Sequence, residues 1–185
     1  MKANELLAML TGGDRRSTGR SEEAAAEVLR DPSLFPALLR GLGEGDARVR
    51  MRCADAAEKV TRERPDLLQP HKMLVFTVAE LEDKQEIRWH MAQMIPRLKL
   101  SGKERLRAAS VFYLYLDDKS SIVKTFAMQA LADLAMQDGS MQRDVLLHLE
   151  RLTAEGTPAM RARGKRLLQQ MKSGIQQPAR PASGC

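Results

Sequence analysis

The amino-acid sequence predicts an all-α protein in which helical hairpins stack into a right-handed α-solenoid. The first observation that predicts this fold is a short motif repeated at a nearly constant spacing. The motif begins at Val49, Ile87, Val123 and Met160, so successive copies lie 38, 36 and 37 residues apart (87 − 49, 123 − 87 and 160 − 123). A repeat period of about 20–50 residues is typical of stacked repeat arrays.

The second observation is an apolar pattern that follows every copy of the motif. Counted from the first residue of each copy, positions +4, +7, +8 and +11 are apolar or small. After Val49 these positions hold Cys53, Ala56, Ala57 and Val60. This spacing predicts a helix with one buried side, and the small residues at +4 predict a close approach of the neighbouring helix.

The third observation is the composition of the chain. Aromatic residues make up 4% and hydrophobic residues 43%, with 11 methionines, which favours helices over sheets. Most methionines fall on apolar positions, so we expect core filling rather than an exposed methionine-rich groove. No apolar run reaches about 18 residues, which predicts no membrane span.

The N-terminal residues and the cysteines bear on the cellular location and on disulfide bonding. The apolar patch at residues 6–10 is too short for a secretory signal, so we expect a cytoplasmic protein. Two cysteines form no disulfide framework in a chain of 185 residues. Cys53 is interpreted as a core thiol and Cys185 as a thiol in an unstructured tail.

The elements follow one another as helix A and then helix B of each hairpin. Residues 1–31 predict a degenerate N-terminal cap with helices over 4–10 and 21–30. Four hairpins follow, which gives about ten helices and a single repeat domain over residues 1–172. The composition of residues 173–185 predicts a disordered tail. The expected A helices lie at 34–42, 67–81, 106–116 and 145–152, and each B helix starts at a motif copy.

Several residues mark the expected ends of these helices. Asp46 and Thr157 occupy positions suited to N-caps, and Asp83 with Glu86 has the spacing of a capping box. Pro96 falls nine residues into its helix and predicts a kink there. The segment 111–116 is apolar on all sides, which predicts the most buried helix of the array.

The sequence resembles the HEAT-repeat superfamily over roughly residues 34–171. The segment AspAlaArgValArgMetArgCysAlaAspAlaAla at 46–57 carries the resemblance best, with an acidic turn, an aliphatic–basic pair and alanine-rich apolar spacing. Asp is missing at the equivalent place in the last repeat, and Pro96 interrupts the second. The resemblance implies an α-solenoid that serves as a scaffold for partner proteins.

Two enzymatic branches of that superfamily fit the sequence poorly. The di-iron hydroxylases carry His–Glu pairs, whereas no Glu follows His71, His90 or His148. The DNA glycosylases need a tryptophan-rich pocket with a catalytic carboxylate, whereas Trp89 is the only tryptophan and Gln93 lies one turn beyond it. We therefore expect no catalytic, cofactor-binding or metal-binding residues.

The net charge of +6 is confined to the end of the chain. From residue 158 onward there are six basic residues and no acid, so residues 1–157 hold 24 of each sign (30 − 6 and 24 − 0). The candidate binding surface for nucleic acid or an acidic protein is the last B helix. Its basic residues are Arg161, Arg163, Lys165, Arg166 and Lys172. The alternative interpretation is a solvated outer face with cations near the helix C-terminus.

A second basic pattern recurs at position +1 of every motif copy. Arg50, Arg88, Lys124 and Arg161 occupy this position. The structural interpretation, which we favour, is that each base binds acids or carbonyl groups of the hairpin turn. The functional interpretation is a basic ladder suited to phosphates.

These observations together predict a non-enzymatic scaffold that holds an unidentified protein partner on the concave face of its B helices. The alternative is a nucleic-acid-binding solenoid that uses the basic last helix, and a HEAT-type glycosylase is the third class. The identity of the partner and the oligomeric state stay open.

Overall fold

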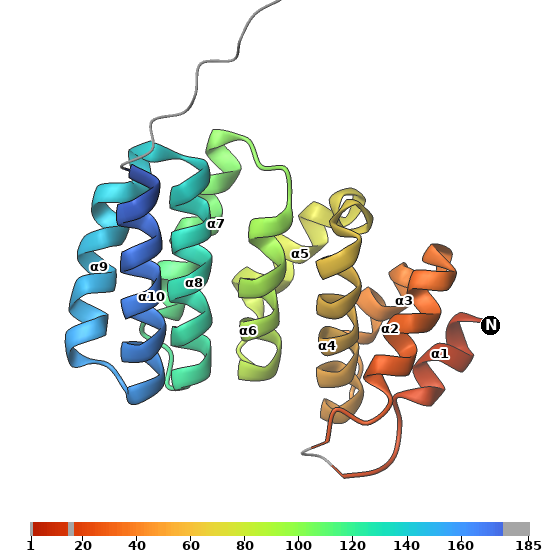
Figure 1. Cartoon of the computed structure of the whole chain (residues 1–185). Helices are drawn as coiled ribbons and strands as arrows, with labels where there is room; N and C mark the ends of the chain where they lie inside the picture. Colours follow the sequence, from red (N-terminus) through yellow and green to blue (C-terminus); the bar gives the residue numbers. More distant parts are fainter. Residues whose placement is uncertain (1, 15–16, 176–185) are drawn as a thin grey trace, which may run out of the picture. The chain divides into compact units, whose positions relative to one another are not determined.

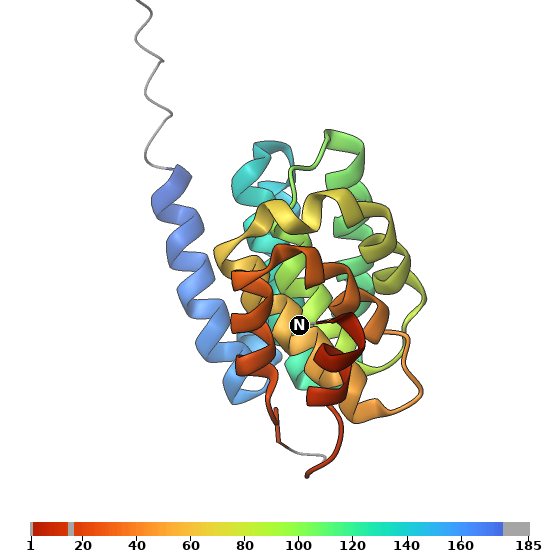
Figure 2. The ribbon, with the colours of Figure 1, turned by 90° about the vertical axis from the view of Figure 1, so that its right-hand side faces the viewer.

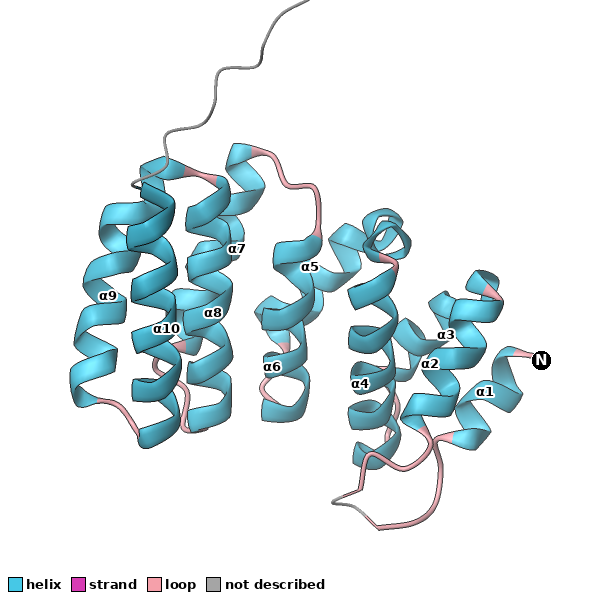
Figure 3. Ribbon diagram, viewed as in Figure 1, coloured by secondary structure: helices cyan, strands magenta, loops and turns pink. Residues whose placement is uncertain are grey.

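The computed structural model describes residues 2–14 and 17–175, and within these ranges the chain is helical without strands (Figures 1 and 3). Ten α-helices follow in order, joined in places by short 3₁₀ turns. They are α1 (Ala3–Met9), α2 (Ser21–Arg30), α3 (Phe35–Gly41), α4 (Ala47–Glu63), α5 (Lys72–Leu81), α6 (Gln85–Met94), α7 (Gly102–Tyr115), α8 (Ser121–Gln137), α9 (Gln142–Glu155) and α10 (Pro158–Ile175). The expectation of an all-α fold with about ten helices is confirmed.

The chain forms two compact units, Met1–Ser101 and Gly102–Cys185. In the first unit α1 packs on α3 and α2 packs on α4 (Figure 2), and α6 packs on α4 and α5. In the second unit α8 packs on α7, while α10 packs on both α9 and α8. A single domain over residues 1–172 with a cap at 1–31 stays a prediction. Helix α10 includes residues 173–175 of the expected tail, and residues 176–185 lie outside the described residues.

The repeating apolar face is confirmed by the burial of its side chains. The four positions +4, +7, +8 and +11 in the four motif copies make sixteen residues. All are buried except Leu168, which is half-buried. Burial of one side of each B helix against its neighbours removes apolar surface from water, which is the main stabilising contribution to such a fold.

Small residues at +4 allow helices to approach closely in both units. A Cβ atom placed on Gly164 of α10 would lie 1.9 Å from Oγ1 of Thr153 in α9. In the first unit, a Cβ on Gly41 of α3 would lie 2.2 Å from Sγ of Cys53, which occupies +4 of α4. The Cys53 side chain is fully buried, and burial raises the pKa of its thiol to about 12, as expected for a core thiol.

Substitution of Gly164 by Ala should lower the free energy of unfolding by about 1–2 kcal/mol. Overpacking a closed helix contact costs about 1–3 kcal/mol, and a Cβ only 1.9 Å from Thr153 Oγ1 belongs in the upper half of that range. The higher helix propensity of Ala offsets about 1 kcal/mol of this cost. Chemical denaturation measures the change. Gly102→Ala is the control, because nothing lies within 4 Å of its added Cβ. A G164A variant as stable as the wild type would show that the α9–α10 contact is not closed.

The expected helix ends are confirmed at two positions. Asp46 Oδ1 accepts a hydrogen bond from the backbone N of Arg48 at 2.8 Å, and Thr157 Oγ1 accepts one from the backbone N of Met160 at 3.4 Å. The expected capping box of Asp83 and Glu86 does not form. Helix α6 starts one residue later, at Gln85, and Glu82 Oε1 instead accepts from the two backbone N–H groups that follow it.

Pro96 ends its helix rather than kinking it, which corrects the sequence-based expectation. Helix α6 stops at Met94, and Ile95–Arg97 forms a 3₁₀ turn that contains the proline. Proline has no backbone N–H, and its ring clashes with the carbonyl group four residues earlier. Ile95 and Leu98 are nevertheless buried, because the 3₁₀ turn keeps the chain next to the core.

A buried carboxylate holds α4 to the end of the next hairpin in the first unit. The Glu58 side chain is 3% exposed and forms ion pairs with Arg97 and with Arg62, the latter at 2.6 Å. Burial alone would raise the pKa of Glu58, but hydrogen bonds from the two guanidinium groups outweigh it and hold the pKa below its ordinary value. Arg97 Nη1 also donates to Thr61 Oγ1 at 2.9 Å.

A second polar contact fixes the loop between α1 and α2. The guanidinium group of Arg52, in α4, is almost fully buried and donates to four backbone carbonyl groups of this segment. The carbonyl oxygens are those of Leu10 (2.8 Å), Gly12 (2.6 Å), Asp14 (2.9 Å) and Ser17 (3.2 Å). The planar group with five donors suits this role, and the periodic pattern of the sequence does not indicate it.

Candidate functional surfaces

The basic residues of α10 do not form a uniform free surface. Arg161 Nη1 donates to the carbonyl oxygen of Gly156 at 2.8 Å, and Lys172 Nζ lies 3.7 Å from a carboxylate oxygen of Glu150. Lys165 and Arg166 are exposed. Because Arg161 and Lys172, although exposed, already make these contacts, Lys165 and Arg166 are the part of the set most available to an outside partner.

Arg163, the fifth basic residue of the set, turns toward the neighbouring helix α8. Its Nη1 donates to Oε1 of Gln129 at 2.8 Å, and its guanidinium carbon lies 5.6 Å from the centre of the Phe126 ring. Burial, and then the charge of Arg166, lower the pKa of Arg163. These contacts indicate a packing role between α8 and α10.

The basic residues at position +1 bind the hairpin turns that precede their helices. Arg50 donates to the carbonyl oxygens of Glu44 (2.7 Å) and Gly45 (2.9 Å). Arg88 donates to that of Glu82 at 2.8 Å, and Arg161 binds its turn in the same way. Three of the four members thus follow the structural interpretation, while the shorter side chain of Lys124 makes no such contact with a described residue.

The groups that carry potential chemistry lie apart or inside the protein. Ser21 Oγ donates to Oδ2 of Asp55 at 2.5 Å, and Lys59 Nζ lies 2.6 Å from the same carboxylate. Ser21, the first residue of α2, is fully buried against α4, so a substrate cannot reach its hydroxyl group. His90 is also buried, and Trp89 is half-buried beside it with ring centres 5.4 Å apart.

Most of the exposed large apolar side chains belong to A helices, whereas the predicted partner site lies on the B helices. Six of the eight such residues in the described part of the chain belong to α5, α7 and α9, and the other two belong to α8. The six are Met73, Leu74, Leu81, Leu106, Leu114 and Leu147.

Helix α7 is therefore not the most buried helix, which corrects the expectation for residues 111–116. Leu106 and Leu114 are 59% and 73% exposed, whereas Phe112 on the opposite side is fully buried. The apolar run contains more apolar residues than the core beneath the helix can cover, so one side of α7 meets solvent.

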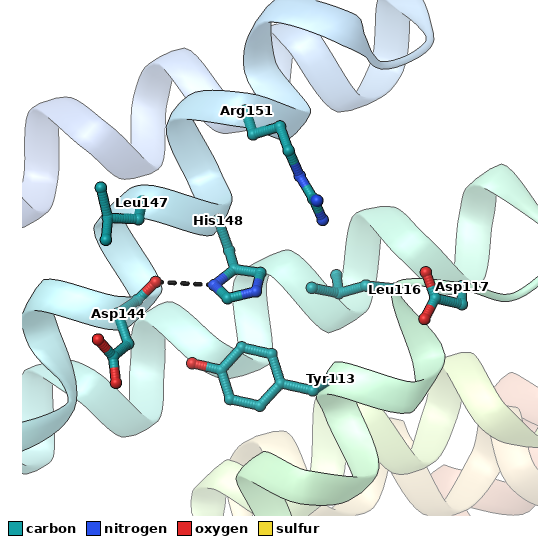
Figure 4. A pocket seen from close by; sticks show the side chains of 7 residues that line it. All are labelled: Tyr113, Leu116, Asp117, Asp144, Leu147, His148 and Arg151. Atoms are coloured by element: carbon teal, nitrogen blue, oxygen red, sulfur yellow. Dashed lines mark hydrogen bonds between the residues drawn. The ribbon is translucent and has the colours of Figure 1, made fainter.

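A groove lies between α7 and α9 in the second unit and encloses about 360 Å³ (Figure 4). Helix α9 contributes residues spaced i, i+3, i+4 and i+7, which places them on one side of the helix. The lining residues are Tyr113, Leu116, Asp117, Asp144, Leu147, His148 and Arg151. The Tyr113 and His148 rings lie with their centres 4.8 Å apart at 52°.

A second groove lies between A helices of the first unit. It encloses about 380 Å³ between α3 and α5 and is largely apolar, with Leu39, Leu42, Leu74, Val78 and Leu81 in its lining. A groove between two consecutive A helices is thus found in both units.

Sequence reasoning missed both grooves for a physical reason. Asp144, Leu147, His148 and Arg151 mix charge with a single apolar residue, so the stripe has no distinct periodic signal. Its partner Tyr113 lies on another helix, 31 residues before Asp144 in the sequence (144 − 113). One available signal was Leu114, which continues an apolar run onto the exposed side of α7.

Comparison with solved structures supports the repeat fold. The crystal structure of an engineered protein matches with a TM-score of 0.64 and 17% identity, covering 93% of this chain and 80% of that chain. A designed armadillo repeat protein matches with a TM-score of 0.61 and 13% identity, covering 98% and 94%. No family model matches the sequence, and neither does any curated protein. These likenesses show the fold alone, an all-α solenoid of helical repeats.

Among the described helices, none is long and apolar enough to cross a bilayer.

Proposed function

We propose that this chain is a non-enzymatic, cytoplasmic scaffold that holds a protein partner on the exposed apolar side chains of its A helices. The observation that carries the proposal is the position of these side chains. Leu81 and Leu114 are 80% and 73% exposed, and each unit has a groove lined by an exposed leucine, Leu81 in the first unit and Leu147 in the second. Large exposed apolar side chains beside a groove are typical of protein interaction sites.

We also propose that the repeats are of the HEAT type rather than the armadillo type. HEAT repeats contain two helices, whereas armadillo repeats contain three. Here each motif copy contributes one B helix and one preceding A helix. The extra helical turns before α3, α5 and α9 are 3₁₀ segments of three to seven residues.

Affinity capture from native lysate tests the proposed function. The wild-type chain should retain one or more proteins, with or without nuclease treatment, as identified by mass spectrometry. A variant that carries Leu81→Glu and Leu114→Glu should lose them, because it places charge on the surface that must be desolvated.

Ile122→Glu supplies the matched control for this capture. Ile122 is an exposed apolar residue on the B helix α8, with 47% exposure. The I122E variant should retain the same proteins as the wild type. Capture that survives in the L81E/L114E variant, or that is lost equally in I122E, would contradict a partner site on the A helices.

The alternative function is nucleic-acid binding through α10. The absence of acids among the described residues of this helix favours it, with Lys165 and Arg166 exposed. Three of its five basic residues already contact other groups within the unit. Nucleic-acid binding predicts capture that collapses with nuclease and affinity that falls steeply with salt.

A further inference from the structure

We propose that the α7–α9 groove binds a segment of a partner protein that presents a basic side chain to Asp144 and an apolar side chain to Leu147. This inference rests on the proposed function and specifies the chemistry of the partner. It draws on the charges, the hydrogen-bonding groups and the apolar surface of one groove within one unit.

The charges that line the groove are not balanced within it. Asp117 and Asp144 supply two exposed carboxylates, and neither has a cationic partner among the residues that the structure describes. Arg151 supplies one guanidinium group, which points into the groove (Figure 4). A complementary segment therefore has to bring more basic than acidic groups.

The aromatic side chains of the groove add to its preference for a hydrogen-bond donor. His148 Nδ1 lies 2.8 Å from the carbonyl oxygen of Asp144. A carbonyl oxygen only accepts, so Nδ1 donates this hydrogen bond and the contact holds the ring in place on α9. The Tyr113 hydroxyl points toward Asp144 (Figure 4), so a carboxylate and an aromatic ring lie together as a receptor for Lys or Arg.

The apolar part of the groove determines the second side chain that the partner presents, which is apolar. Leu116 is 5% exposed and contributes to the buried floor, whereas Leu147 is 58% exposed and forms part of the wall. An apolar side chain laid between them would cover Leu147 and remove it from water. Burial of an exposed leucine removes apolar surface from water, so this contact supplies affinity while the charges select the partner.

The direction of the bound segment follows from the order of charges along α9. Asp144 and Arg151 are seven residues apart, which separates them by about 10 Å along the helix axis. A basic side chain at Asp144 and a carboxylate near Arg151 would satisfy both. The reversed orientation would place like charges together at each end.

A library of displayed random peptides tests this inference on the full chain. Peptides of about 15 residues are long enough to span the groove as four helical turns. Selection on the wild type, followed by removal of all binders to Leu147→Glu, should enrich sequences with a basic and an apolar residue at fixed spacing. The enriched peptides should lose about tenfold or more in affinity for Asp144→Lys, because like charges then meet in the groove.

Glu155→Lys is the matched control, since it makes the same charge change on α9 outside this groove. Affinity for E155K should stay within about twofold of the wild type. Enriched peptides that are acidic or uncharged would overturn the partner chemistry while leaving a protein-binding function in place. A selection that yields no peptide dependent on Leu147 would overturn the groove itself. The capture from lysate decides the proposed function independently.

Discussion

Replacement of Arg97 by Met should lower the free energy of unfolding by about 3–5 kcal/mol. The change removes the main partner of Glu58, a residue of α4 whose side chain is only 3% exposed, and leaves its charge buried. Removal of one member of a buried ion pair typically costs this much, because the remaining charge keeps its desolvation penalty. Urea denaturation followed by circular dichroism measures the loss.

Two further variants separate this effect from a general loss of packing. Arg62→Met removes the other partner of Glu58, but Arg62 is 64% exposed, so the loss should stay below about 1 kcal/mol. The double variant E58M/R97M should recover most of the stability, because no charge is then left buried. A loss below about 1 kcal/mol in R97M would mean that Glu58 is hydrated rather than buried.

Acidification from pH 7 to pH 5 should lower the free energy of unfolding by about 2 kcal/mol through His90 alone. Burial lowers the pKa of His90 to about 4, from an ordinary value of 6.5 in the unfolded chain. Between these values the unfolded chain binds the proton and the folded chain does not, so stability falls as pH falls. The contribution is fully present above pH 6.5 and is lost by about pH 4.

The slope of stability against pH is the readout for this effect. Each pH unit between 6.5 and 4 should cost about 1.4 kcal/mol in the wild type, whereas His90→Gln should flatten that part of the curve. The carboxylates of Asp55 and Glu58 raise the pKa of His90, whereas Lys59 and Arg97 lower it, and burial is the largest of these effects. The lowered pKa of Glu58 adds a loss in the same direction at more acidic pH. An unchanged slope in H90Q would assign the acid sensitivity to other groups.

The sequence predicted those parts of the fold that repeat. The period placed the B helices, and the +4, +7, +8 and +11 positions identified their buried sides, because helical periodicity states directly which side meets the core. The close approach at Gly164 also followed, since a small residue at a fixed place in the repeat has a steric meaning. Comparable logic explained the arginines at +1, which bind turn carbonyls at the same place in three repeats.

The parts that do not repeat escaped the sequence analysis. Arg52 binds carbonyl groups 35–42 residues earlier in the chain, and Arg97 reaches Glu58 from 39 residues away. From the sequence alone, Arg52 and Arg97 are indistinguishable from ordinary surface arginines. The outcome at Pro96 depended on whether neighbouring packing would sustain a bent helix, and the chain ended α6 instead.

The candidate surface was the least predictable feature of the molecule. The net charge predicted a binding surface on α10. Three of the five basic residues of this helix, however, contact Gly156, Gln129 and Glu150 within the same unit. Exposure of Leu106 and Leu114 depends on how much of α7 its neighbours cover, and no local pattern encodes that. A binding surface in a solenoid is what packing leaves uncovered, so it emerges only with the fold.

Site-specific photo-crosslinking in native lysate tests the central claim most directly. A photoreactive amino acid replaces Leu114 on the A helix α7 in one variant and Ile122 on the B helix α8 in another. A partner held on the A helices predicts a discrete protein crosslink at position 114 and none at 122. A crosslink at 122 alone, or crosslinks to nucleic acid at both positions, would contradict it.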